Sequence, residues 1–479
     1  MTRAHVLLII AAFWAAIYLP GLGSAELKGE EGRRILPAIT MLETGNWVVP
    51  YIGGEPYLRK PPLVNWMIAS SFAMTGERNE WSARLPLVLC VLALGLTIGG
   101  VCTRWLGART AVAAALFSIA NVAMIEKGRL AEIEALYVAL SGIAMVLWLA
   151  WSEQGRSRWL VWSIPFLFNG LALLAKGPAH LLFFYAVVLA TPRGRRELFS
   201  LPHLVGLLLM GGIFAAWAVP YFKATAALRS AGEGADASGV WLAQIMERLG
   251  GGDFVPGDWA LSLPRGLSNF LPWVLLVPLW WKQPSREPWF RHVRNVVTAA
   301  YIGFLLIPGF LPRYTMPLLV PAALLLAVTL RDGAFPWWHR IRSRLNTGRV
   351  PAAADLGIAC AGAALAALVI LIYAVLLTPL LHRYDDVRPL GEGIAATVPE
   401  GQSLYVYDIE FEPAMFYVRR PVRYEAKFER LPQDLPWVLA KEKELPKFKR
   451  NYRQLEERAE FRNRDGSKLK LLSASGKKR

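Results

Sequence analysis

Long apolar runs separated by short polar connections fill most of the chain before residue 383. A helix needs about 20 apolar residues to cross a bilayer. Eleven windows approach that length, at residues 5–22, 84–103, 108–125, 133–152, 159–175, 177–192, 203–221, 262–281, 295–310, 313–330 and 353–381. The pattern predicts a mainly α-helical polytopic membrane protein with about 11–13 transmembrane helices.

Basic residues alternate with these windows. Short cytoplasmic connections are enriched in Lys and Arg. With Arg3 inside, the connections on the same side carry Arg104, Arg109, Arg156, Arg158, Arg193, Arg195, Arg196, Lys282, Arg286, Arg291, Arg294, Arg331, Arg340, Arg342, Arg344 and Arg349. We therefore expect the loops at 23–83 and 222–261, and the tail from 383, outside the membrane. The first window could pass for a signal peptide, but the alternation needs it, so we expect it to be retained.

Two more apolar patterns lie within the first outside loop. Apolar residues recur at helical spacing over residues 35–42, which predicts an amphipathic helix at the interface. The apolar run at 63–75 follows Pro61-Pro62 and is too short to cross a bilayer. We expect both segments to be interfacial helices. The second large loop is rich in Gly around an amphipathic piece at 240–249, and we expect it to be mobile.

The tail from residue 383 has a different composition. Residues 402–409 and 415–422 alternate like strands, and residues 441–458 are charged and helix-prone. We expect a small α/β domain outside the membrane. The predicted organisation is a transmembrane catalytic domain at 1–382 and a soluble periplasmic domain at 383–479.

Composition agrees with the membrane assignment, because 54% of the 479 residues are apolar. The net charge of +17 lies mostly on cytoplasmic connections, so we expect no nucleic-acid partner. The three cysteines lie in or beside apolar windows and indicate neither a disulfide framework nor a Cys-based metal site. The six His residues lack the spacing of a metal site, while a metal held by carboxylates stays open.

Ionisable residues that the topology places outside, near membrane level, come from four loops. They are Glu30, Glu31, Arg33, Arg34, Arg59 and Lys60; Glu126, Lys127, Arg129, Glu132 and Glu134; Lys176; and Arg313 beside Tyr314. Such groups are costly and tend to be functional, although each taken singly also fits a snorkelling interfacial charge. We expect them to meet at one face of the bundle and to suit chemistry on a phosphorylated lipid. Arg84, by contrast, we expect to contact lipid headgroups at a helix start.

A longer motif runs through the first 330 residues. Its members are Glu30, Glu31, Arg33, Met41, Thr44, Gly45, Asn46, Trp47, Pro50, Gly54, Tyr57, Lys60, Pro61, Pro62, Leu63, Trp66, Glu80, Trp81, Ala83, Arg84, Leu85, Pro86, Arg129, Glu134, Lys176, Gly177, Pro178, Arg313, Tyr314, Pro317 and Pro321. In order and spacing the motif resembles the polyprenyl-phosphate-sugar-dependent glycosyltransferases of the GT-C fold. That group includes the bacterial aminoarabinose transferases of lipid A and protein O-mannosyltransferase-like enzymes.

The resemblance implies an inverting glycosyltransferase in the bacterial inner membrane, active on the periplasmic face in cell-envelope and lipopolysaccharide synthesis. It would move a hexose or a pentose from an undecaprenyl-phosphate-type donor to a lipid A-like lipid or a glycan. The resemblance implies that Glu30 is the catalytic carboxylate. Together with the charges, the resemblance implies three further sets of residues. Glu31 and Glu134 are further catalytic candidates. The expected ligands of the donor phosphate are Lys60, Lys176, Arg59 and Arg313, and the expected substrate contacts are Arg33, Tyr57, Arg129 and Tyr314. The expected partners are the donor, the acceptor and membrane lipids.

Two positions depart from the family. Glu30 stands where the family usually has Asp, and Arg59 stands where an acidic residue is common. We expect no certain cofactor, and a divalent metal ion stays open. A transporter or flippase of a lipid-linked intermediate is the main rival, with a protein O-glycosyltransferase and a structural scaffold as further alternatives. Transporters favour polar groups at the midplane and internal repeats, whereas these windows are apolar and show no repeat.

Overall fold

The computed structural model describes all residues except 231–235, 251–255, 283–284, 306, 308–310, 334–353, 383–384, 408–412, 426, 463–465 and 479. The chain divides into two compact units. The first comprises Met1–Pro20, Leu87–Val219 and Gly239–Tyr373. The second comprises Gly21–Pro86, Pro220–Ser238 and Ala374–Arg479, so the first loop and the tail belong to the same unit. Each unit is described by itself below, and the domain boundary at 383 stays a prediction.

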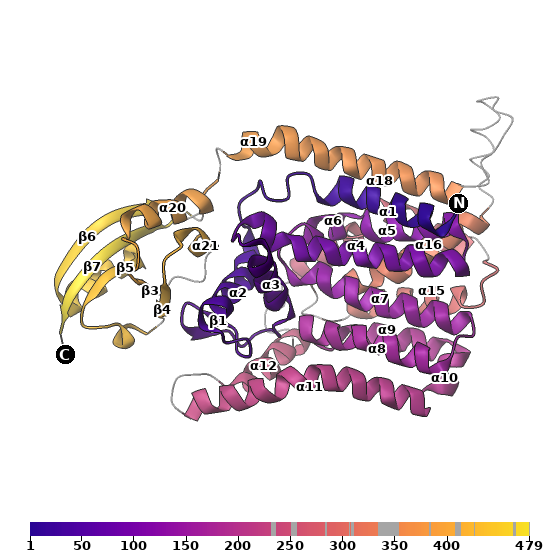
Figure 1. The fold of residues 1–479 in the computed structure, drawn as a ribbon, viewed down its shortest axis with the longest axis horizontal. Coiled ribbons are helices and arrows are strands. Elements are labelled where there is room, and N and C mark those ends of the chain that lie inside the picture. Colours follow the sequence, from indigo (N-terminus) through magenta and orange to yellow (C-terminus); the bar gives the residue numbers. More distant parts are fainter. Residues whose placement is uncertain are drawn as a thin grey trace. The chain divides into compact units, whose positions relative to one another are not determined.

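The first unit is a helical bundle (Figure 1). Its helices are α1 (Arg3–Tyr18), α4 (Glu80–Trp105, from Leu87), α5 (Ala108–Ile119), α6 (Val122–Gly128), α7 (Ile133–Glu153), α8 (Arg158–Ala175), α9 (Ala179–Ala190), α10 (Pro192–Glu197), α11 (Leu201–Ser230, to Val219), α12 (Ala237–Gly250, from Gly239), α13 (Pro256–Ser268), η2 (Trp273–Leu276), α14 (Leu279–Lys282), α15 (Phe290–Leu305), η3 (Pro312–Leu318), α16 (Leu319–Asp332) and α18 (Ala354–Ile372). Almost every side chain of α7 is buried, and α7 packs against α8 and α16. This helix therefore forms the core of the bundle.

Each of the eleven apolar windows overlaps one or more helices within the described residues. Within the described residues, six helices are long and apolar enough to cross a membrane, or eight if two bent pairs, α5 with α6 and α13 with α14, each count as one span. The remaining windows correspond to α1, α9 and α15, which have 16, 12 and 16 residues. The polytopic class is confirmed, and a total of eleven or more crossings stays a prediction.

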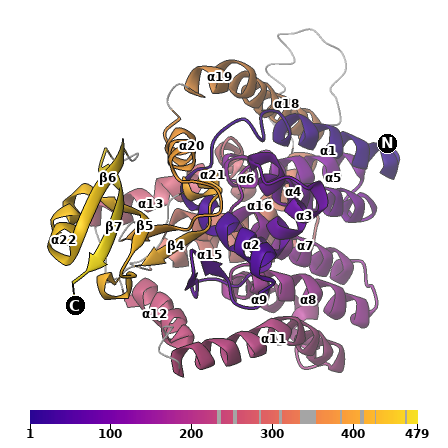
Figure 2. The ribbon, with the colours of Figure 1, turned by 60° about the vertical axis from the view of Figure 1, so that its left-hand side comes forward.

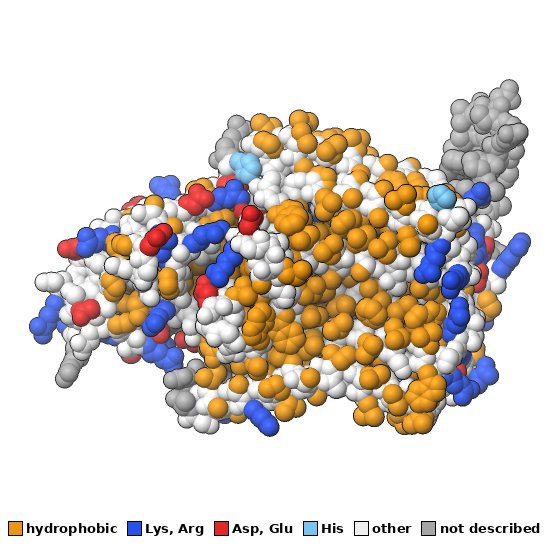
Figure 3. Space-filling view, viewed as in Figure 1, with side chains coloured by type: hydrophobic (Ala, Val, Ile, Leu, Met, Phe, Trp, Pro, Cys, Tyr) orange, Lys and Arg blue, Asp and Glu red, His pale blue; other side chains and the backbone are white. Residues whose placement is uncertain are grey.

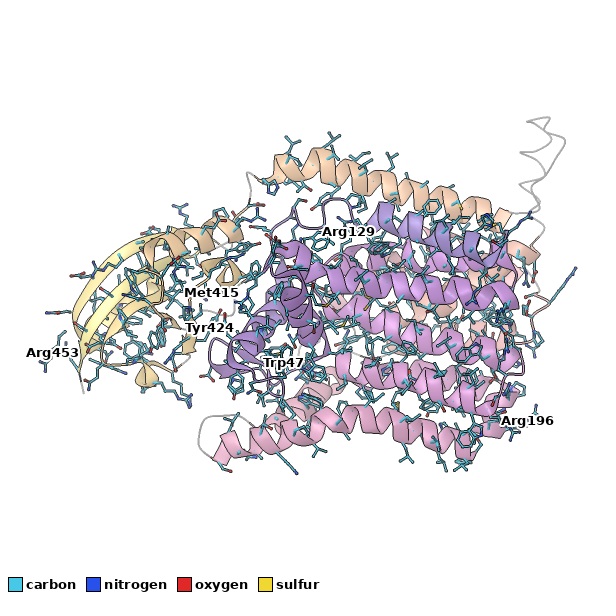
Figure 4. The ribbon with its side chains drawn as sticks, viewed as in Figure 1. Trp47, Arg129, Arg196, Met415, Tyr424 and Arg453 are labelled. Carbon is cyan, nitrogen blue, oxygen red and sulfur yellow. The ribbon has the colours of Figure 1, made fainter. Side chains whose placement is uncertain are left out.

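The ends of the bundle differ in charge. At one end Arg193 donates hydrogen bonds to the carbonyl oxygens of Ser152 and Arg156, both at 2.7 Å, and Arg158 pairs with Glu197 at 3.2 Å. Figure 3 shows hydrophobic side chains over the helices, and Lys and Arg gathered at the end beside α10. Figure 4 places Arg196 at that end and Arg129 toward the other. These basic connections therefore share one end, as the alternation predicts; the basic residues at 340–349 lie outside the described residues.

The first loop, in the second unit, forms two helices joined by a hairpin. The segment η1 (Gly29–Glu31) leads into α2 (Gly32–Thr44), which ends at Gly45 with φ of 70°. The hairpin pairs β1 (Tyr51–Ile52) with β2 (Glu55–Pro56), and α3 (Leu63–Thr75) packs against α2. The helices expected at 35–42 and 63–75 are therefore confirmed as helices. Their place at a membrane interface stays a prediction.

The tail folds around a five-stranded sheet in the order β4-β3-β5-β7-β6. Its elements are α19 (Thr378–Leu381), α20 (Val387–Thr397), β3 (Leu404–Tyr407), α21 (Met415–Val418), β4 (Val422–Glu425), η6 (Phe428–Arg430), β5 (Leu435–Lys441), η7 (Glu442–Glu444), α22 (Leu445–Asn451), β6 (Tyr452–Arg462) and β7 (Lys468–Lys477). Strand β3 runs parallel to β4 and β5, and the other pairs are antiparallel. Figure 2 shows α22 beside β6 and β7. Phe448 of α22 packs with Phe428 and Tyr452 in the core.

Two expectations for the tail are wrong. Residues 415–418 form a helical turn, in which all four side chains are buried, and only 422–425 form a strand. The helix expected at 441–458 is limited to Leu445–Asn451, and β6 begins at Tyr452. Most β6 side chains are at least partly exposed, so the β6 sequence lacks the alternation of apolar and polar residues that predicts a strand. Backbone pairing with β7 decides the conformation of β6.

Candidate active site

Glu30 lies in the turn that opens α2, and its carboxylate accepts hydrogen bonds from two arginines. Arg33 Nη1 lies 2.9 Å from Oε1, and Arg34 Nη2 lies 3.2 Å from Oε2. The spacing of three and four residues puts both guanidinium groups on the same side of the helix as Glu30. The Glu30 side chain remains 36% exposed. It is thus the accessible carboxylate of the Glu30-Glu31 pair.

Arg34 continues this chain of contacts into the loop. Its Nη1 donates to the Tyr57 hydroxyl at 2.9 Å, and its carbonyl oxygen accepts from Asn65 Nδ2 at 2.7 Å. Arg34 is buried, whereas Arg33 is 32% exposed. Sequence reasoning chose Arg33 for the substrate site. Arg34 shares a helical face with the buried Ala38 and Met41, and this spacing could have identified it.

Glu31 is fully buried and forms an ion pair with Arg84, at 2.8 Å from both Nε and Nη2. Arg84 also donates to the carbonyl oxygens of Leu22, Ala25 and Glu26. The expectation that Arg84 contacts lipid headgroups is therefore wrong: its side chain is only 2% exposed. A buried carboxylate requires a cationic partner. Arg84, the partner of Glu31, lies 53 residues farther along the chain.

The remaining first-loop cations flank the start of α3. Arg59 is exposed and Lys60 is half-buried, directly before Pro61-Pro62. Leu58, just before them, accepts a hydrogen bond from the Tyr221 hydroxyl at 3.4 Å, which ties the segment to α11. Among the described residues, no group of three or more His, Cys, Asp or Glu side chains is placed to hold a metal ion. The described residues therefore do not fit a metal centre held by three such side chains.

A second charged cluster lies within the bundle unit. Glu134 in the first turn of α7 accepts from Lys176 at 3.2 Å, and the Arg313 guanidinium lies 3.9 Å from the same oxygen. Lys176 follows the last turn of α8, and Arg313 lies in η3. The Lys176 and Glu134 side chains are only 16% and 10% exposed, whereas Arg313 is 42% exposed. Two cations facing one carboxylate leave an excess positive charge that suits an anionic ligand.

Aromatic rings fix Lys176 in this cluster. Its Nζ lies 5.4 Å from the ring centroid of Tyr137 and 5.8 Å from that of Tyr314, at cation–π distances. The Tyr137 hydroxyl in turn accepts a hydrogen bond from the backbone N–H of His180. Tyr137 and His180 were missed in the sequence, although Tyr137 follows Glu134 by three residues on the same helical face. The predicted residues Glu134, Lys176, Arg313 and Tyr314 are thus brought together.

Arg129 contacts the end of α1. Its guanidinium donates to the carbonyl oxygens of Ile17 and Tyr18, at 2.8 and 2.9 Å, and to that of Pro20 at 2.6 Å. These are carbonyls at the end of α1 that lack helical partners. These bonds hold Arg129 at the end of α1, and its contact with substrate stays a prediction. Lys127 likewise pairs locally with Glu126 at 3.1 Å and Glu132 at 3.2 Å.

The helical bundle, the two-helix first loop and the α/β tail define the GT-C class of membrane glycosyltransferase folds. ArnT from Cupriavidus metallidurans bound to undecaprenyl phosphate matches with a TM-score of 0.70 at 17% identity, covering 100% of both chains. Residues 59–219 also match the family described as dolichyl-phosphate-mannose-protein mannosyltransferase. The resemblance noted in the sequence to GT-C transferases that use lipid-linked sugars is therefore confirmed.

Sequence relatives lead to one particular group. The undecaprenyl phosphate-alpha-4-amino-4-deoxy-L-arabinose arabinosyl transferase of Pseudomonas aeruginosa strain LESB58 is 27% identical over 409 residues, which cover 79% of this chain and 67% of the relative. Transferase 1 of the same description from Pseudomonas fluorescens strain Pf-5 is 27% identical over 343 residues, covering 69% of this chain and 61% of that relative. The chain thus spans about three fifths of the length of that second relative.

Proposed function

We propose that the chain is an inverting glycosyltransferase that moves a sugar from an undecaprenyl-phosphate-type donor to a lipid A-like lipid or a glycan. We place the reaction at the periplasmic face of the bacterial inner membrane. The observation that carries the proposal is the match along the whole chain to a transferase fold with undecaprenyl phosphate bound. The relatives described as undecaprenyl-phosphate-dependent arabinosyl transferases support the same donor class.

The cationic groups serve the donor phosphate in this proposal. As the bond from the anomeric carbon to the phosphate oxygen breaks, negative charge grows on the departing phosphate and must be stabilised. Lys176 offers a largely buried cation and Arg313 a more exposed one, and Lys60 with Arg59 offers two more in the first loop. Without the donor, Glu134 balances the charge of Lys176. We therefore assign Glu134 to holding Lys176 rather than to proton transfer.

Glu30 is the proposed catalytic carboxylate. The acceptor hydroxyl oxygen attacks the anomeric carbon from the face opposite the phosphate, so a new glycosidic bond forms with inversion as the phosphate leaves. The hydroxyl proton passes to the Glu30 carboxylate, which is exposed enough to receive it. Arg34 and Tyr57 orient Glu30, and Arg33 lies on its open side. Glu31 supports this turn through Arg84 and takes no proton. If the acceptor is a phosphate, Glu30 orients the nucleophile instead.

The comparisons also bear on the identity of the sugar and of the acceptor. The relatives are described as arabinosyl transferases, which favours a pentose, and a 4-amino-4-deoxy pentose in particular. The protein mannosyltransferase match over residues 59–219 favours the second candidate, a protein O-glycosyltransferase with a hexose donor. The membrane-lipid setting and the lipid-linked donor are common to both candidates.

A reconstituted transfer assay tests the proposal. Purified protein in lipid nanodiscs is given undecaprenyl phosphate-linked 4-amino-4-deoxyarabinose, and separately a polyprenyl-phosphate hexose, with lipid A or an unstructured Ser/Thr-rich peptide as acceptor. Mass spectrometry of lipids and peptide should show one added pentose on lipid A and release of undecaprenyl phosphate. A hexose on the peptide would favour the second candidate. Donor movement between leaflets without bond cleavage would favour a flippase and contradict the proposal.

A further inference from the structure

The first loop and the tail belong to one compact unit and are joined on both sides of α2. The first junction lies just before Glu30. The Glu26 carboxylate accepts hydrogen bonds from the backbone N–H groups at the start of α20: Val387 at 2.9 Å, Arg388 at 3.0 Å and Asp386 at 3.4 Å. Glu26 is only 7% exposed. It satisfies donors that a helix leaves unpaired and places negative charge at the positive end of the helix.

Glu80 strengthens the same junction. The Tyr417 hydroxyl donates to the Glu80 carboxylate at 2.8 Å and accepts from the Leu27 N–H at 2.9 Å, while Arg388 pairs with Glu80. Burial and the Glu80 charge raise the pKa of Tyr417, so its hydroxyl keeps the proton that it donates. On the other side, Arg84 holds the Glu26 carbonyl oxygen at 3.0 Å. The segment before Glu30 is therefore held by Arg84 and by the tail.

The second junction lies after α2, at the β1–β2 turn. The Gly53 carbonyl oxygen accepts from the backbone N–H of Tyr424 in β4 at 2.6 Å. A Cβ placed on Gly53 would lie 1.7 Å from Cδ2 of the Tyr424 ring, so the contact needs glycine. Gly53 also has φ of 56°, which side chains rarely adopt. Next to it, Arg430 lies 3.6 Å from the Glu55 carboxylate.

Glu30 and Arg34 lie between the two junctions in the chain, and Tyr57 lies four residues after Gly53. Glu30 follows Glu26 by four residues, and Tyr57 donates its N–H to Pro50 across the hairpin at 2.7 Å. The pairs of Glu30 with Arg33 and Arg34 are local, and such partly exposed pairs stabilise a structure only weakly. They cannot by themselves fix the place of α2. Packing of α2 against α3 and the segments at the two ends of α2 together set its position.

We propose that the tail domain is a two-point clamp on the first loop, which holds Glu30 and Tyr57 in their working geometry. Glu26 and Gly53 are its positioning residues, since each acts through α2 or the hairpin and not on the substrate. The clamp rests on the proposed role of Glu30. It predicts that loosening either junction slows the chemical step even though Glu30, Arg34 and Tyr57 are all present, because small displacements of reacting groups are costly.

The test uses the full chain in nanodiscs and compares matched variants. Glu26→Gln removes the charge at the first junction, and Glu43→Gln is its control, since Glu43, at the end of α2, is 54% exposed in a pair with Arg78. Gly53→Ala places a methyl group against Tyr424. Gly54→Ala is its control, because Gly54 also has positive φ, 91°, but no atom lies within 4 Å of the added Cβ. The double variant Gly53→Ala/Tyr424→Ala removes the ring that the methyl group meets.

Two measurements are made on each variant: hydrogen exchange of the α2 amides, and kcat and donor KM for sugar transfer. We expect Glu26→Gln and Gly53→Ala to exchange faster over residues 32–44, with α7 unchanged, and to lose about 10- to 100-fold in kcat with little change in KM. The controls should resemble the wild type. Tyr424→Ala should restore the activity of Gly53→Ala to that of Gly54→Ala.

The two measurements separate the clamp from the proposed function. Wild-type protein without transfer activity would contradict the function, while α2 exchange would still decide whether the clamp exists. In an active preparation, wild-type exchange and wild-type kcat in both junction variants would overturn the clamp. If Tyr424→Ala does not restore the activity lost in Gly53→Ala, the second junction specifically is overturned. Equal losses in the junction variants and their controls would assign the effect to general destabilisation and would also overturn it.

Discussion

The Glu31 carboxylate and the Arg84 guanidinium form a two-point ion pair at 2.8 Å, with neither side chain more than 2% exposed. Glu30, one residue earlier, keeps 36% of its side chain exposed. The two neighbouring carboxylates therefore differ sharply in environment. One fixes the turn that opens α2, and the other remains accessible to a ligand.

Breaking the buried pair should destabilise the protein. Glu31→Gln leaves the Arg84 charge buried without its counter-ion, and loss of one partner of a buried pair costs about 3–5 kcal/mol. Glu43→Gln, at an exposed pair with Arg78, should cost at most about 1 kcal/mol. Thermal unfolding in detergent compares the two variants. Equal midpoints would show that the Glu31–Arg84 pair contributes no more than a surface pair.

The cation at the end of α8 should matter for transfer. Lys176→Met keeps the bulk and removes the charge, so it should lower kcat by about 10²- to 10³-fold. Lys60→Met should lower it similarly if Lys60 also meets the donor phosphate. Lys127→Met is the control, because Lys127 is a bundle lysine that pairs locally with Glu126 and Glu132. Wild-type turnover in both Lys60→Met and Lys176→Met would show that these lysines are snorkelling interfacial charges and do not bind the donor phosphate.

The topology can be measured by labelling single cysteines. With Cys90, Cys102 and Cys360 replaced by Ser, the exposed positions Thr44, Glu400 and Arg196 are each changed to Cys. An impermeant maleimide added to intact cells with a permeable outer membrane should label the first two and spare the third. Labelling of the third alone would place the first loop and the tail in the cytoplasm and reverse the proposed orientation.

Glu425 at the end of β4 gives a pH dependence with a definite sign. Burial and the neighbouring Glu55 carboxylate raise the pKa of Glu425 above its ordinary value. The folded state therefore holds this proton more tightly than the unfolded state. The associated stability is fully present below the ordinary carboxyl pKa and is lost as pH rises through the folded pKa. Glu425→Gln should unfold at a higher temperature than wild type at pH 8 and at nearly the same temperature at pH 4. A gap of equal size at both pH values would contradict this sign.

The sequence predicted elements where local pattern decides the structure. Each apolar window overlaps a helix within the described residues, and the run at 63–75 is α3 with the same bounds. The prediction failed where contacts between residues distant in the sequence decide the structure. The sequence alone predicts an interfacial charge at Arg84, because the buried pair with Glu31 depends on the fold. It predicts a helix at 441–458, because the pairing of the second half of this run with β7 also depends on the fold. Arg34 was named only among the cations of the first loop and was not assigned to substrate, because its partner Tyr57 lies beyond the hairpin.

The most direct measurement is sugar transfer from purified donor lipid by Glu30→Gln and Glu31→Gln variants, with turnover normalised to folded protein. Gln keeps the shape of the Glu30 side chain but is not a base, so Glu30→Gln should lose about 10²- to 10⁴-fold in kcat. Its donor KM and unfolding temperature should stay near wild type, since this carboxylate is accessible and only locally paired. Glu31→Gln should instead unfold at a lower temperature and lose less turnover per folded molecule than Glu30→Gln. Full activity in Glu30→Gln, with or without loss in Glu31→Gln, would contradict the assignment of Glu30 as the catalytic carboxylate.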